Sequence, residues 1–509
     1  MKKNRIRLAV PAALLLAALL GALTLAERHA PGATITSFGA ALWYGLTTLT
    51  TVGYGDAYPV TVLGRVIGTV FQLLSLGFLA LAVGTVLALL RGNLLPRLRL
   101  ARRRREDRYL FSRSSEAARA LAAGLRAADP NCVTLCAGPA DPEFPGLCLD
   151  LPPERIARLP RGKGRLYCFC MEDSEAENQR LAGRLAGPDC QVYCMSRDLP
   201  GIPEIHCFDP FSCCARLYWQ RHPLAGPEEK VVLLGSGPWA EAILEEGLCR
   251  NLLDPDQRVR YTVIGDFGDF RRCRPRLDLA CDPALGFGDR LTFLDGPWNQ
   301  DLALLAEADR LIFCDADEAR IRKALGNLFR FCPVTGQVHA RLSEPLAGVS
   351  VFGAPEELFT PELVLHRSLD RLAMALHETY RQKTGGLPGW EALSDFTRRS
   401  NLASADHLPR KLEILLGRPG ALTAENCRAA LDRFRALPPE QRSRLRRIEH
   451  LRWARFHRLN NWVWGPVRDN ARRIHPALVA FDDLSPADQA KDDYAWELLS
   501  AAAEQQGTH

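Results

Sequence analysis

The sequence predicts a multi-domain protein in which a helical, membrane-spanning part precedes two α/β units and a mainly helical C-terminal part. Two long uncharged apolar runs lie within the first 108 of the 509 residues. Short apolar runs then alternate with helical stretches as far as Phe352, which is typical of parallel sheets. The last 150 residues lack that alternation. A chain of this length is too long for one hydrophobic core and suits three or four domains.

The basic residues are concentrated in the first fifth of the chain. Residues 1–108 carry 14 Lys or Arg against 4 Asp or Glu, whereas the remaining 401 carry 51 basic and 55 acidic residues. A protein that binds nucleic acid more often spreads its basic residues over a folded face. Here they bracket two apolar runs, so we expect a lipid membrane as partner and no nucleic acid.

The two apolar runs predict two transmembrane helices. Residues 8–26 and 66–90 are uncharged, and each is long enough to cross about 30 Å of hydrocarbon. Basic residues precede the first run, and a cluster of arginines between Arg91 and Arg108 follows the second. The positive-inside rule therefore places both termini in the cytosol. The first run taken alone also fits a secretory signal peptide, but the segment between the runs argues against that.

That segment carries a short helix and then a distinctive string. Residues 38–49 are apolar and aromatic, which predicts a helix of about three turns. The string that follows is Thr51, Val52, Gly53, Tyr54 and Gly55. Two glycines in alternate positions let the successive backbone carbonyls of such a string all point to one side. The backbone then alternates between right-handed and left-handed conformations, which glycine permits at little steric cost.

This string resembles the selectivity filter of potassium channels. The resemblance implies that K⁺ is the permeant ion and that the backbone carbonyls of Thr51, Val52, Gly53 and Tyr54 hold it. Trp43, Tyr44 and Asp56 are the expected supports of the filter. One chain supplies one filter strand and a ring needs four, so we expect a homotetramer.

The second span holds the candidate gate hinge. In two-span channels a glycine commonly lies 11 residues after the glycine at the start of this span; counted from Gly64, that position is Ser75. Gly77 and Gly84 follow. Helices bend at Gly/Ser clusters, so Ser75, Gly77 and Gly84 are all candidates and the choice stays open.

Two series of strands follow the pore. The first series is predicted at residues 109–111, 132–136, 166–169, 192–195 and 205–208, with helices at 116–126 and 174–185. The second series is predicted at residues 231–234, 261–264, 291–294, 311–314, 338–341 and 349–352. Each series favours a Rossmann-like sheet. The chain therefore contains two such units in tandem.

Only the second unit has a glycine-rich turn. Gly235, Gly237 and Ala240 form the pattern G-x-G-x-x-A at the start of a helix, which lets a phosphate approach the helix N-terminus. Asp266 ends the next strand, where a ribose-binding acid would lie. It comes 31 residues after Gly235 rather than about 20, and an insertion at 251–258 is the expected source of the longer spacing. Bound NAD or another adenine nucleotide fits this pattern, and so does a retained turn without a ligand.

The sixteen cysteines lie between Cys132 and Cys427 with no Cys-x-x-Cys pair. This favours reduced, buried cysteines of cytosolic domains. We expect neither zinc nor heme.

A two-span pore followed by tandem Rossmann units resembles the regulator-of-K⁺-conductance (RCK or KTN) architecture. The resemblance covers roughly residues 8–355 and implies a cytosolic ring that pulls on the second span. We expect a pore domain at 1–105, a degenerate Rossmann-like domain at 106–226 and an RCK domain at 227–358.

The remaining residues, 359–509, are expected to form one further domain, and about residues 366–500 of it resemble the RyR domain repeated in ryanodine receptors. The matching elements are Glu449-His450-x-x-Trp453 on a helix, the turn from Trp462 to Asp469, and His475-Pro-x-Leu. Residues 365–384 are expected to form an amphipathic helix. Aromatic faces and arginines suit a flat, charged ligand. The ligand candidates are Trp453, Trp462, Trp464, Arg468, Asp469 and His475, although large aromatic residues also form the cores of small helical domains.

Together these patterns predict a ligand-gated, homotetrameric K⁺ channel in a prokaryotic plasma (inner) membrane. Its fold is a two-span α-helical pore, two α/β Rossmann-like domains and a mainly α-helical RyR domain. The expected ligand is a small cytosolic molecule, with nucleotide derivatives as candidates. We expect no enzyme, because no Cys–His, Ser–His or paired-carboxylate constellation accompanies Gly235. The alternatives are a membrane-tethered nucleotide-binding signalling protein without conduction and, less favoured, a tethered oxidoreductase.

Overall fold

The structure, a computed structural model, describes residues 2–89, 100, 106–160, 163–197 and 205–506. The arginines predicted to follow the second span, between Arg91 and Arg105, lie outside the described residues. Two compact units are present. The first contains Met1–Glu106, Leu135–Pro142 and Gly146–Gly164, and the second contains Asp107–Thr134, Glu143–Pro145 and Arg165–His509.

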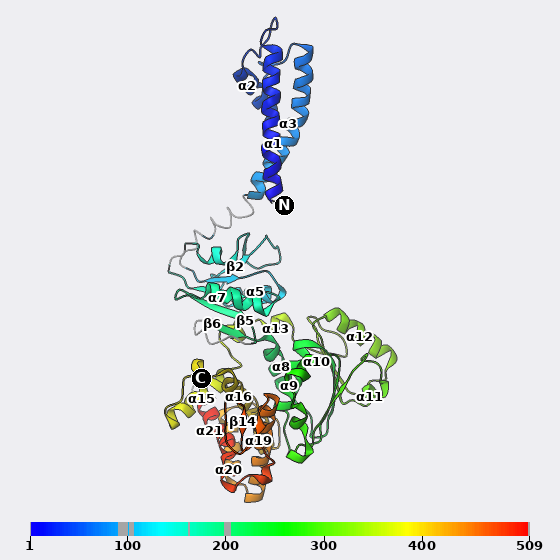
Figure 1. Ribbon diagram of the computed structural model, residues 1–509, viewed down its shortest axis with the longest axis vertical. Helices are drawn as coiled ribbons and strands as arrows, with labels where there is room; N and C mark the ends of the chain where they lie inside the picture. The colour runs from blue at the N-terminus through cyan, green and yellow to red at the C-terminus, as the bar shows by residue number, and fades with distance from the viewer. Residues whose placement is uncertain (1, 90–99, 101–105, 161–162, 198–204, 507–509) are drawn as a thin grey trace. The chain divides into compact units, whose positions relative to one another are not determined.

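Three helices form the N-terminal part. They are α1 (Lys2–Glu27), α2 (Phe38–Leu49) and α3 (Val62–Leu89). Helices α1 and α3 lie side by side, with α2 against both (Figure 1). The helix predicted at residues 38–49 is confirmed. Among the described residues, one helical segment is long and apolar enough to cross a membrane, Val62–Ala80, with a mean hydropathy of 1.7; the searched part of α1 is Leu14–Glu27.

A buried carboxylate joins the end of α1 to the start of α3. Glu27 is fully buried and accepts hydrogen bonds from the Val60 amide at 2.9 Å and the Thr61 amide at 2.9 Å. The Thr61 hydroxyl donates to the same carboxylate at 2.6 Å. A side chain at Gly64 would collide with Glu27, since an added Cβ would lie 1.9 Å from its Oε1. Glu27 therefore fixes the entry of the chain into α3.

Two six-stranded parallel sheets follow. The first has β1 (Arg108–Phe111), β2 (Val133–Ala137), β3 (Leu147–Leu149), β4 (Leu166–Cys170), β5 (Cys190–Met195) and β6 (Ile205–Phe208). Its strand order is β3-β2-β1-β4-β5-β6, the doubly wound order of Rossmann folds. Its helices are α5 (Glu116–Ala128), α6 (Pro153–Ala157), α7 (Glu175–Leu185) and α8 (Pro210–Arg221). Strand β3, which has only three residues, was not predicted.

The second sheet has the same topology. Its strands are β7 (Lys230–Gly235), β8 (Arg260–Ile264), β9 (Arg290–Leu294), β10 (Arg310–Cys314), β11 (Gln337–Arg341) and β12 (Ser350–Phe352). The order β12-β11-β10-β7-β8-β9 puts the point where the strand order reverses between β7 and β10. The larger helices are α9 (Gly237–Arg250) and α12 (Glu318–Phe331), and the shorter segments are α10 (Gly268–Cys273), η2 (Leu277–Cys281), η3 (Pro283–Leu285) and α11 (Leu302–Ala306). Helices α13 (Pro355–Leu358) and α14 (Pro361–Val364) lead out of the sheet. All six predicted strands of this series are confirmed.

The C-terminal part is mainly helical. Its helices are α15 (Arg371–Thr384), α16 (Asp395–Asp406), α17 (Leu408–Leu416), α18 (Ala424–Ala436), α19 (Pro439–Leu459), α20 (Pro486–Lys491) and α21 (Asp493–Gln506), with short turns η4 (Trp390–Ala392) and η5 (Phe481–Asp483). Strands β13 (Val463–Trp464) and β14 (Ile474–His475) pair in parallel. The helix expected at 365–384 begins only at Arg371. The start is delayed because Arg367 adopts a left-handed conformation with φ +48°.

The loop at residues 251–258, which follows α9, and Leu224 before β7 both contact helices of the C-terminal part. His407 Nε2 lies 2.8 Å from the carbonyl oxygen of Leu252, and Arg410 donates to the carbonyl of Leu224 at 2.8 Å. Leu252 belongs to the same hydrophobic core as the buried leucines of α17 and α19. Residues 251–258, which the spacing after Gly235 suggested to be an insertion, therefore pack against the helices of the C-terminal part.

Candidate functional site

The string after α2 has an alternating backbone. Thr51, Gly53 and Gly55 have φ values of +62°, +57° and +74°, so every second residue is left-handed. The amides of Val52 and Gly53 donate to the Thr47 carbonyl at the end of α2, at 2.9 and 3.1 Å. Successive backbone carbonyls can all point to the same side only if the backbone conformation alternates in this way. Left-handed backbone is strained for a β-branched residue such as Thr51.

Trp43 and Asp56 brace the string. The Trp43 indole donates to Asp56 Oδ2 at 2.8 Å, and its ring stacks on Tyr54 with centroids 5.9 Å apart and planes 1° from parallel. Tyr44 lies elsewhere, buried against Phe71 of α3 with a centroid distance of 6.2 Å. Two of the three predicted supports, Trp43 and Asp56, therefore bond to each other beside the string. The third, Tyr44, joins α2 to α3.

The hinge candidates differ in their surroundings. Ser75 is buried, and its hydroxyl donates to the Gln72 carbonyl one turn earlier at 2.8 Å. At Gly77 and Gly84 an added Cβ would meet nothing within 4 Å. All three lie within the continuous helix α3. Ser75 is therefore packed in this conformation, whereas both glycines have open space beside them.

The glycine-rich turn is explained largely by backbone packing. A Cβ on Gly235 would lie 1.8 Å from the Cys314 carbonyl oxygen on β10, so only glycine fits between β7 and β10. Gly237, at φ +74°, faces open space at the start of α9. Ala240 is buried. The exposed Asp266 carboxylate accepts the Gly268 amide of its own turn at 3.0 Å.

Two neighbours of this turn affect anion binding there. The Ser236 hydroxyl lies 3.2 Å from the Asp315 carboxylate, which is mostly buried at the end of β10. Arg320 Nη1 lies 3.5 Å from the same carboxylate and offsets part of its negative charge; the remainder opposes the approach of a phosphate. The Trp239 ring at the start of α9 is covered by the Arg341 guanidinium at 4.6 Å. The turn is therefore less suited to a nucleotide than its glycines alone indicate.

The C-terminal part encloses a cavity of about 880 Å³ between α15, α16, α19 and the segment from β13 to α21. Its aromatic lining consists of Tyr380, Trp453, Trp464 and Tyr494 together with the imidazoles of His377, His450 and His475. Its ionisable lining includes Glu449, Arg452, Arg468, Asp483, Asp488, Lys491 and Asp492. Cavities of about 300–1,000 Å³ lined by aromatic groups with a few polar groups are typical of small-molecule sites.

Glu449 and Arg452, which line the cavity, form a buried ion triad with Lys411 behind them. Glu449 accepts from Arg452 Nη2 at 2.6 Å and from Lys411 Nζ at 2.8 Å, and Lys411 also donates to the Ala495 carbonyl at 2.9 Å. Burial alone would raise the pKa of Glu449, but Arg452 and Lys411 together hold it well below its ordinary value. The triad is therefore ionised and pins α17 to α19.

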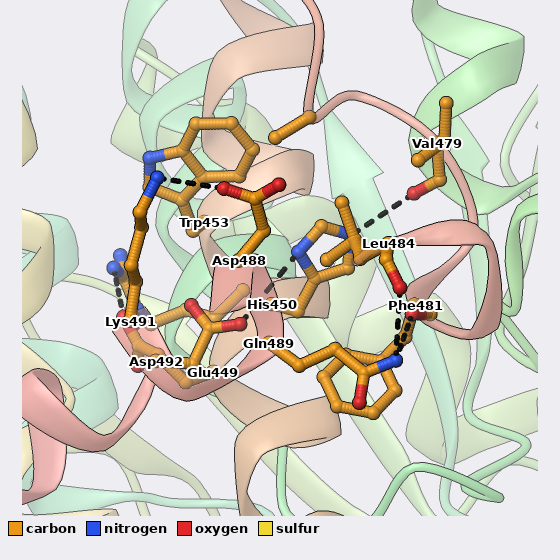
Figure 2. A network of polar contacts seen from close by, with 12 residues as sticks. Glu449, His450, Trp453, Val479, Phe481, Leu484, Asp488, Gln489, Lys491 and Asp492 are labelled. Atoms are coloured by element: carbon orange, nitrogen blue, oxygen red, sulfur yellow. Dashed lines mark hydrogen bonds and ion pairs between the residues drawn. The ribbon is translucent and has the colours of Figure 1, made fainter. Parts of the chain in front are cut away.

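Beside the triad, Asp492 lies close to His450 (Figure 2). Burial, reinforced by the negative charge of Glu449, raises the pKa of Asp492 to about 8. Burial lowers the pKa of His450, whose Nε2 lies 2.9 Å from the Val479 carbonyl and must carry the proton there. The unprotonated Nδ1 of His450 then faces Asp492 Oδ2 at 3.8 Å. A protonated Asp492 carboxyl suits this acceptor, so the cavity holds a neutral acid near neutral pH.

Some of the predicted ligand residues line this cavity together. Trp453, Trp464, Arg468 and His475 all line it, and the Trp453 and His475 rings are 4.9 Å apart edge to face. Trp464 is 58% exposed and presents an open face.

Trp462 and Asp469 lie outside the cavity lining. The Trp462 ring is buried and stacks on Phe396 at 5.1 Å, as expected of a core residue. The Asp469 carboxylate accepts the Arg472 amide at 3.0 Å and shapes the loop between β13 and β14. The lining residues that were not predicted as ligand candidates include three that follow the motif by ten residues or more and have no periodic signal: Asp488, Lys491 and Asp492.

The face of α19 that points away from the cavity contacts the part of the chain that forms the second sheet. Arg455 is 1% exposed; it donates to Asp289 Oδ2 at 2.8 Å and to the carbonyls of Ala280 and Leu248 at 2.9 and 3.0 Å. Arg458 donates to the Leu279 carbonyl at 3.3 Å. One helix therefore carries cavity residues on one side and domain contacts on the other.

Comparison with known proteins bears on the N-terminal part. Residues 12–92 match a family model described as an ion channel. The "Voltage-gated potassium channel" of Aeropyrum pernix is 43% identical over 65 residues, 13% of this chain and 22% of the relative. Human "Potassium voltage-gated channel subfamily KQT member 4" is 48% identical over 60 residues, 12% of this chain and 8% of the relative. The chain spans about a fifth or less of the length of these relatives.

Solved structures similar to the chain include two of the GsuK channel. One, titled as bound to NAD, is 12% identical, covers 73% of this chain and 86% of its own, and has a TM-score of 0.36. The other, titled as bound to ADP, is 14% identical, covers 72% and 100%, and has the same TM-score. The chain thus has a helical channel-pore region followed by α/β parallel-sheet domains.

Proposed function

We propose that this chain is one subunit of a homotetrameric, ligand-gated K⁺ channel of a prokaryotic plasma membrane. The observation that carries the proposal is the alternating left-handed backbone at Thr51, Gly53 and Gly55, braced by Trp43. Residues 51–56 are exposed in the single chain. Four copies would surround a pathway in which the carbonyls of Thr51, Val52, Gly53 and Tyr54 replace water around K⁺.

The sensor in this proposal is the C-terminal helical part, of RyR type. Its cavity offers the Trp453 and Trp464 rings for stacking and the Arg468 guanidinium for an anionic group. This combination favours a nucleotide-derived ligand. The cavity is the better candidate because Asp315 opposes a phosphate at the Gly235 turn.

Helix α19 would carry the signal. A ligand that contacts Arg452 or Trp453 acts on the same rigid helix that holds Asp289 through Arg455. The ring of Rossmann units would then bias the second span. Such a ligand changes the open probability only if it binds the open and closed states with different affinities.

Conduction is tested by K⁺ flux into liposomes that contain the full-length protein. Gly53→Ala forces a side chain into left-handed backbone, which costs about 1–2 kcal/mol per chain, and we expect it to abolish flux. Gly39→Ala in α2 is the matched control, because its added Cβ would only reach Ser37 at 3.7 Å. Equal flux in wild type and Gly53→Ala would refute the proposal.

Ligand gating is tested by single-channel recording with AMP, ADP and NAD. The double variant Trp464→Ala/Arg468→Ala should lose the response to whichever of these nucleotides gates the channel. Val467→Ala should keep it, since Val467 is 76% exposed on the same loop but outside the cavity lining. A current indifferent to all three nucleotides, and to the double variant, would contradict nucleotide gating and leave conduction standing.

A further inference from the structure

The first sheet gathers cysteines on one of its faces. Cys168 and Cys170 alternate along β4, and Cys190 and Cys194 lie on β5. In the parallel register Leu166 pairs with Cys190 and Cys170 with Cys194, so all four thiols share a face. The opposite face carries stacked aromatic rings, including Phe169. The alternation of a strand thus separates a thiol face from an aromatic face.

Two of these thiols are in contact. Cys190 Sγ and Cys168 Sγ are 3.2 Å apart, across neighbouring strands. A disulfide requires about 2.05 Å between sulfurs, so closure needs a movement of roughly 1 Å. Cys168 is fully buried, whereas Cys190, at the start of β5, is partly exposed. One member of the pair can therefore meet a dissolved oxidant, and the other is shielded from solvent beside it.

A second pair of one buried and one partly exposed cysteine lies on β2 and β3. Cys136 is buried, Cys148 is partly exposed, and the two are directly paired in the parallel register. A hydrogen bond from Cys136 lowers the pKa of Cys148 to about 7 against the opposing effect of burial. A large part of Cys148 is therefore thiolate at cytosolic pH, and the thiolate is the form that reacts with oxidants.

We propose that the first sheet is a thiol-redox site in which Cys190 with Cys168, and Cys148 with Cys136, close into disulfides under peroxide. The exposed thiolate attacks one oxygen of hydrogen peroxide, giving a sulfenic acid and hydroxide. The buried thiol of the pair then attacks the sulfenic sulfur, and one water leaves as the sulfur–sulfur bond forms. Each pair gives up two electrons and two protons, and one peroxide is reduced to two waters.

The pairing distinguishes this site from ordinary buried cysteine. A low-pKa or exposed thiol next to a second cysteine is the arrangement found in redox sensors, because the second thiol traps the sulfenic acid before further oxidation. A cytosolic disulfide of this kind forms transiently and is reduced again by cellular thiols. The proposal stands independently of ion conduction, since it concerns only the chemistry of the first sheet.

The test uses full-length protein, reduced and then exposed to hydrogen peroxide, blocked with N-ethylmaleimide and digested with trypsin. Peptides 166–180 and 185–197 should appear cross-linked, with a mass about 2 Da below their sum. Cys190→Ser and Cys168→Ser should each abolish this cross-link. Cys194→Ser and Cys170→Ser are matched controls on the same strands and should retain it. Cys136 and Cys148 lie on one tryptic peptide, residues 127–155, so their disulfide should appear as that peptide with both thiols unalkylated and a mass about 2 Da lower, and Cys148→Ser should remove this species.

Three results would overturn the proposal. The first is peroxide-treated protein in which both pairs remain fully alkylated. The second is oxidation of Cys190 or Cys148 only to sulfinic or sulfonic acid, which would show that no neighbouring thiol traps the intermediate. The third is a cross-link that survives Cys190→Ser but disappears in Cys194→Ser, which would assign the bond to the Cys170–Cys194 pair. Dithiothreitol should restore all four thiols to alkylation.

Discussion

Replacing Asp492 by asparagine tests the electrostatics of the cavity. In the folded chain, burial and the charge of Glu449 raise the pKa of Asp492 from an ordinary value of 3.8 to about 8. The folded state therefore holds the Asp492 proton across a pH range in which the unfolded state has released it. The stabilising contribution is complete below about pH 4 and is lost progressively as the pH rises to about 8. The Asp492→Asn variant would have no such dependence, because its amide does not ionise.

The magnitude follows from the two pKa values. The loss is about 1.4 kcal/mol per pH unit between them, which sums to about 6 kcal/mol. The side chain is only 17% exposed, so solvent screens little of this. Between pH 5 and pH 8 the wild type should lose about 4 kcal/mol relative to Asp492→Asn. At about 2–4 °C per kcal/mol, the difference in melting temperature should grow by roughly 10 °C.

The assay is thermal unfolding of the full-length protein followed by tryptophan fluorescence, at each pH from about 4 to about 9, which brackets the interval over which the contribution is lost. Asp483→Asn is the control, because Asp483 lines the same cavity but is exposed. Its melting curve should follow the wild type at every pH. Parallel pH profiles for wild type and Asp492→Asn would refute the reasoning, since they would show that Asp492 ionises at an ordinary pH.

Three further outcomes are expected. Trp43→Phe keeps an aromatic ring but removes the hydrogen bond to Asp56, worth about 1.5–3 kcal/mol, so K⁺ over Na⁺ selectivity in liposome flux should fall. Arg455→Met leaves the Asp289 carboxylate buried and unpaired, which should destabilise the chain by about 3–5 kcal/mol in denaturant unfolding, and Asp289→Asn in the same chain should recover part of the loss. Gly247→Ala places a Cβ 2.7 Å from an indole ring between α8 and α9, so it should cost about 1–3 kcal/mol in the same measurement.

The sequence was most informative where short-range patterns decide the structure. The helix at residues 38–49 and the left-handed positions at Gly53 and Gly55 follow from composition and steric freedom alone. The strands of both sheets were predictable because parallel strands buried on two faces are continuous apolar runs. Strand β3 escaped, because three residues between Pro145 and Pro152 give no such run.

The cavity could be predicted only in part. Trp453 and His475 belong to a recognisable motif, but Tyr380 and Asp492 come from α15 and from the end of α20, far from it in sequence. Their meeting depends on how the helices pack, which periodicity does not encode. The same limit explains why the sequence did not distinguish Trp462 from Trp464. An aromatic residue two positions from Trp464 gives the same sequence signal, yet one packs in the core and the other faces the cavity.

Helix α19 shows that a sequence rich in charged residues does not always indicate an exposed helix, and that burying those residues restricts how the helix can move. Its sequence is rich in Arg, Glu and His, and such a helix is ordinarily exposed on most sides. Instead Glu449, Arg452, Arg455 and Arg458 are all buried, each with a partner on another element or one turn away. Buried ion pairs add little net stability, but breaking one leaves a costly unpaired charge. The helix therefore cannot shift relative to Asp289 by small steps, and a ligand that displaces Arg452 must move the helix and its partners together.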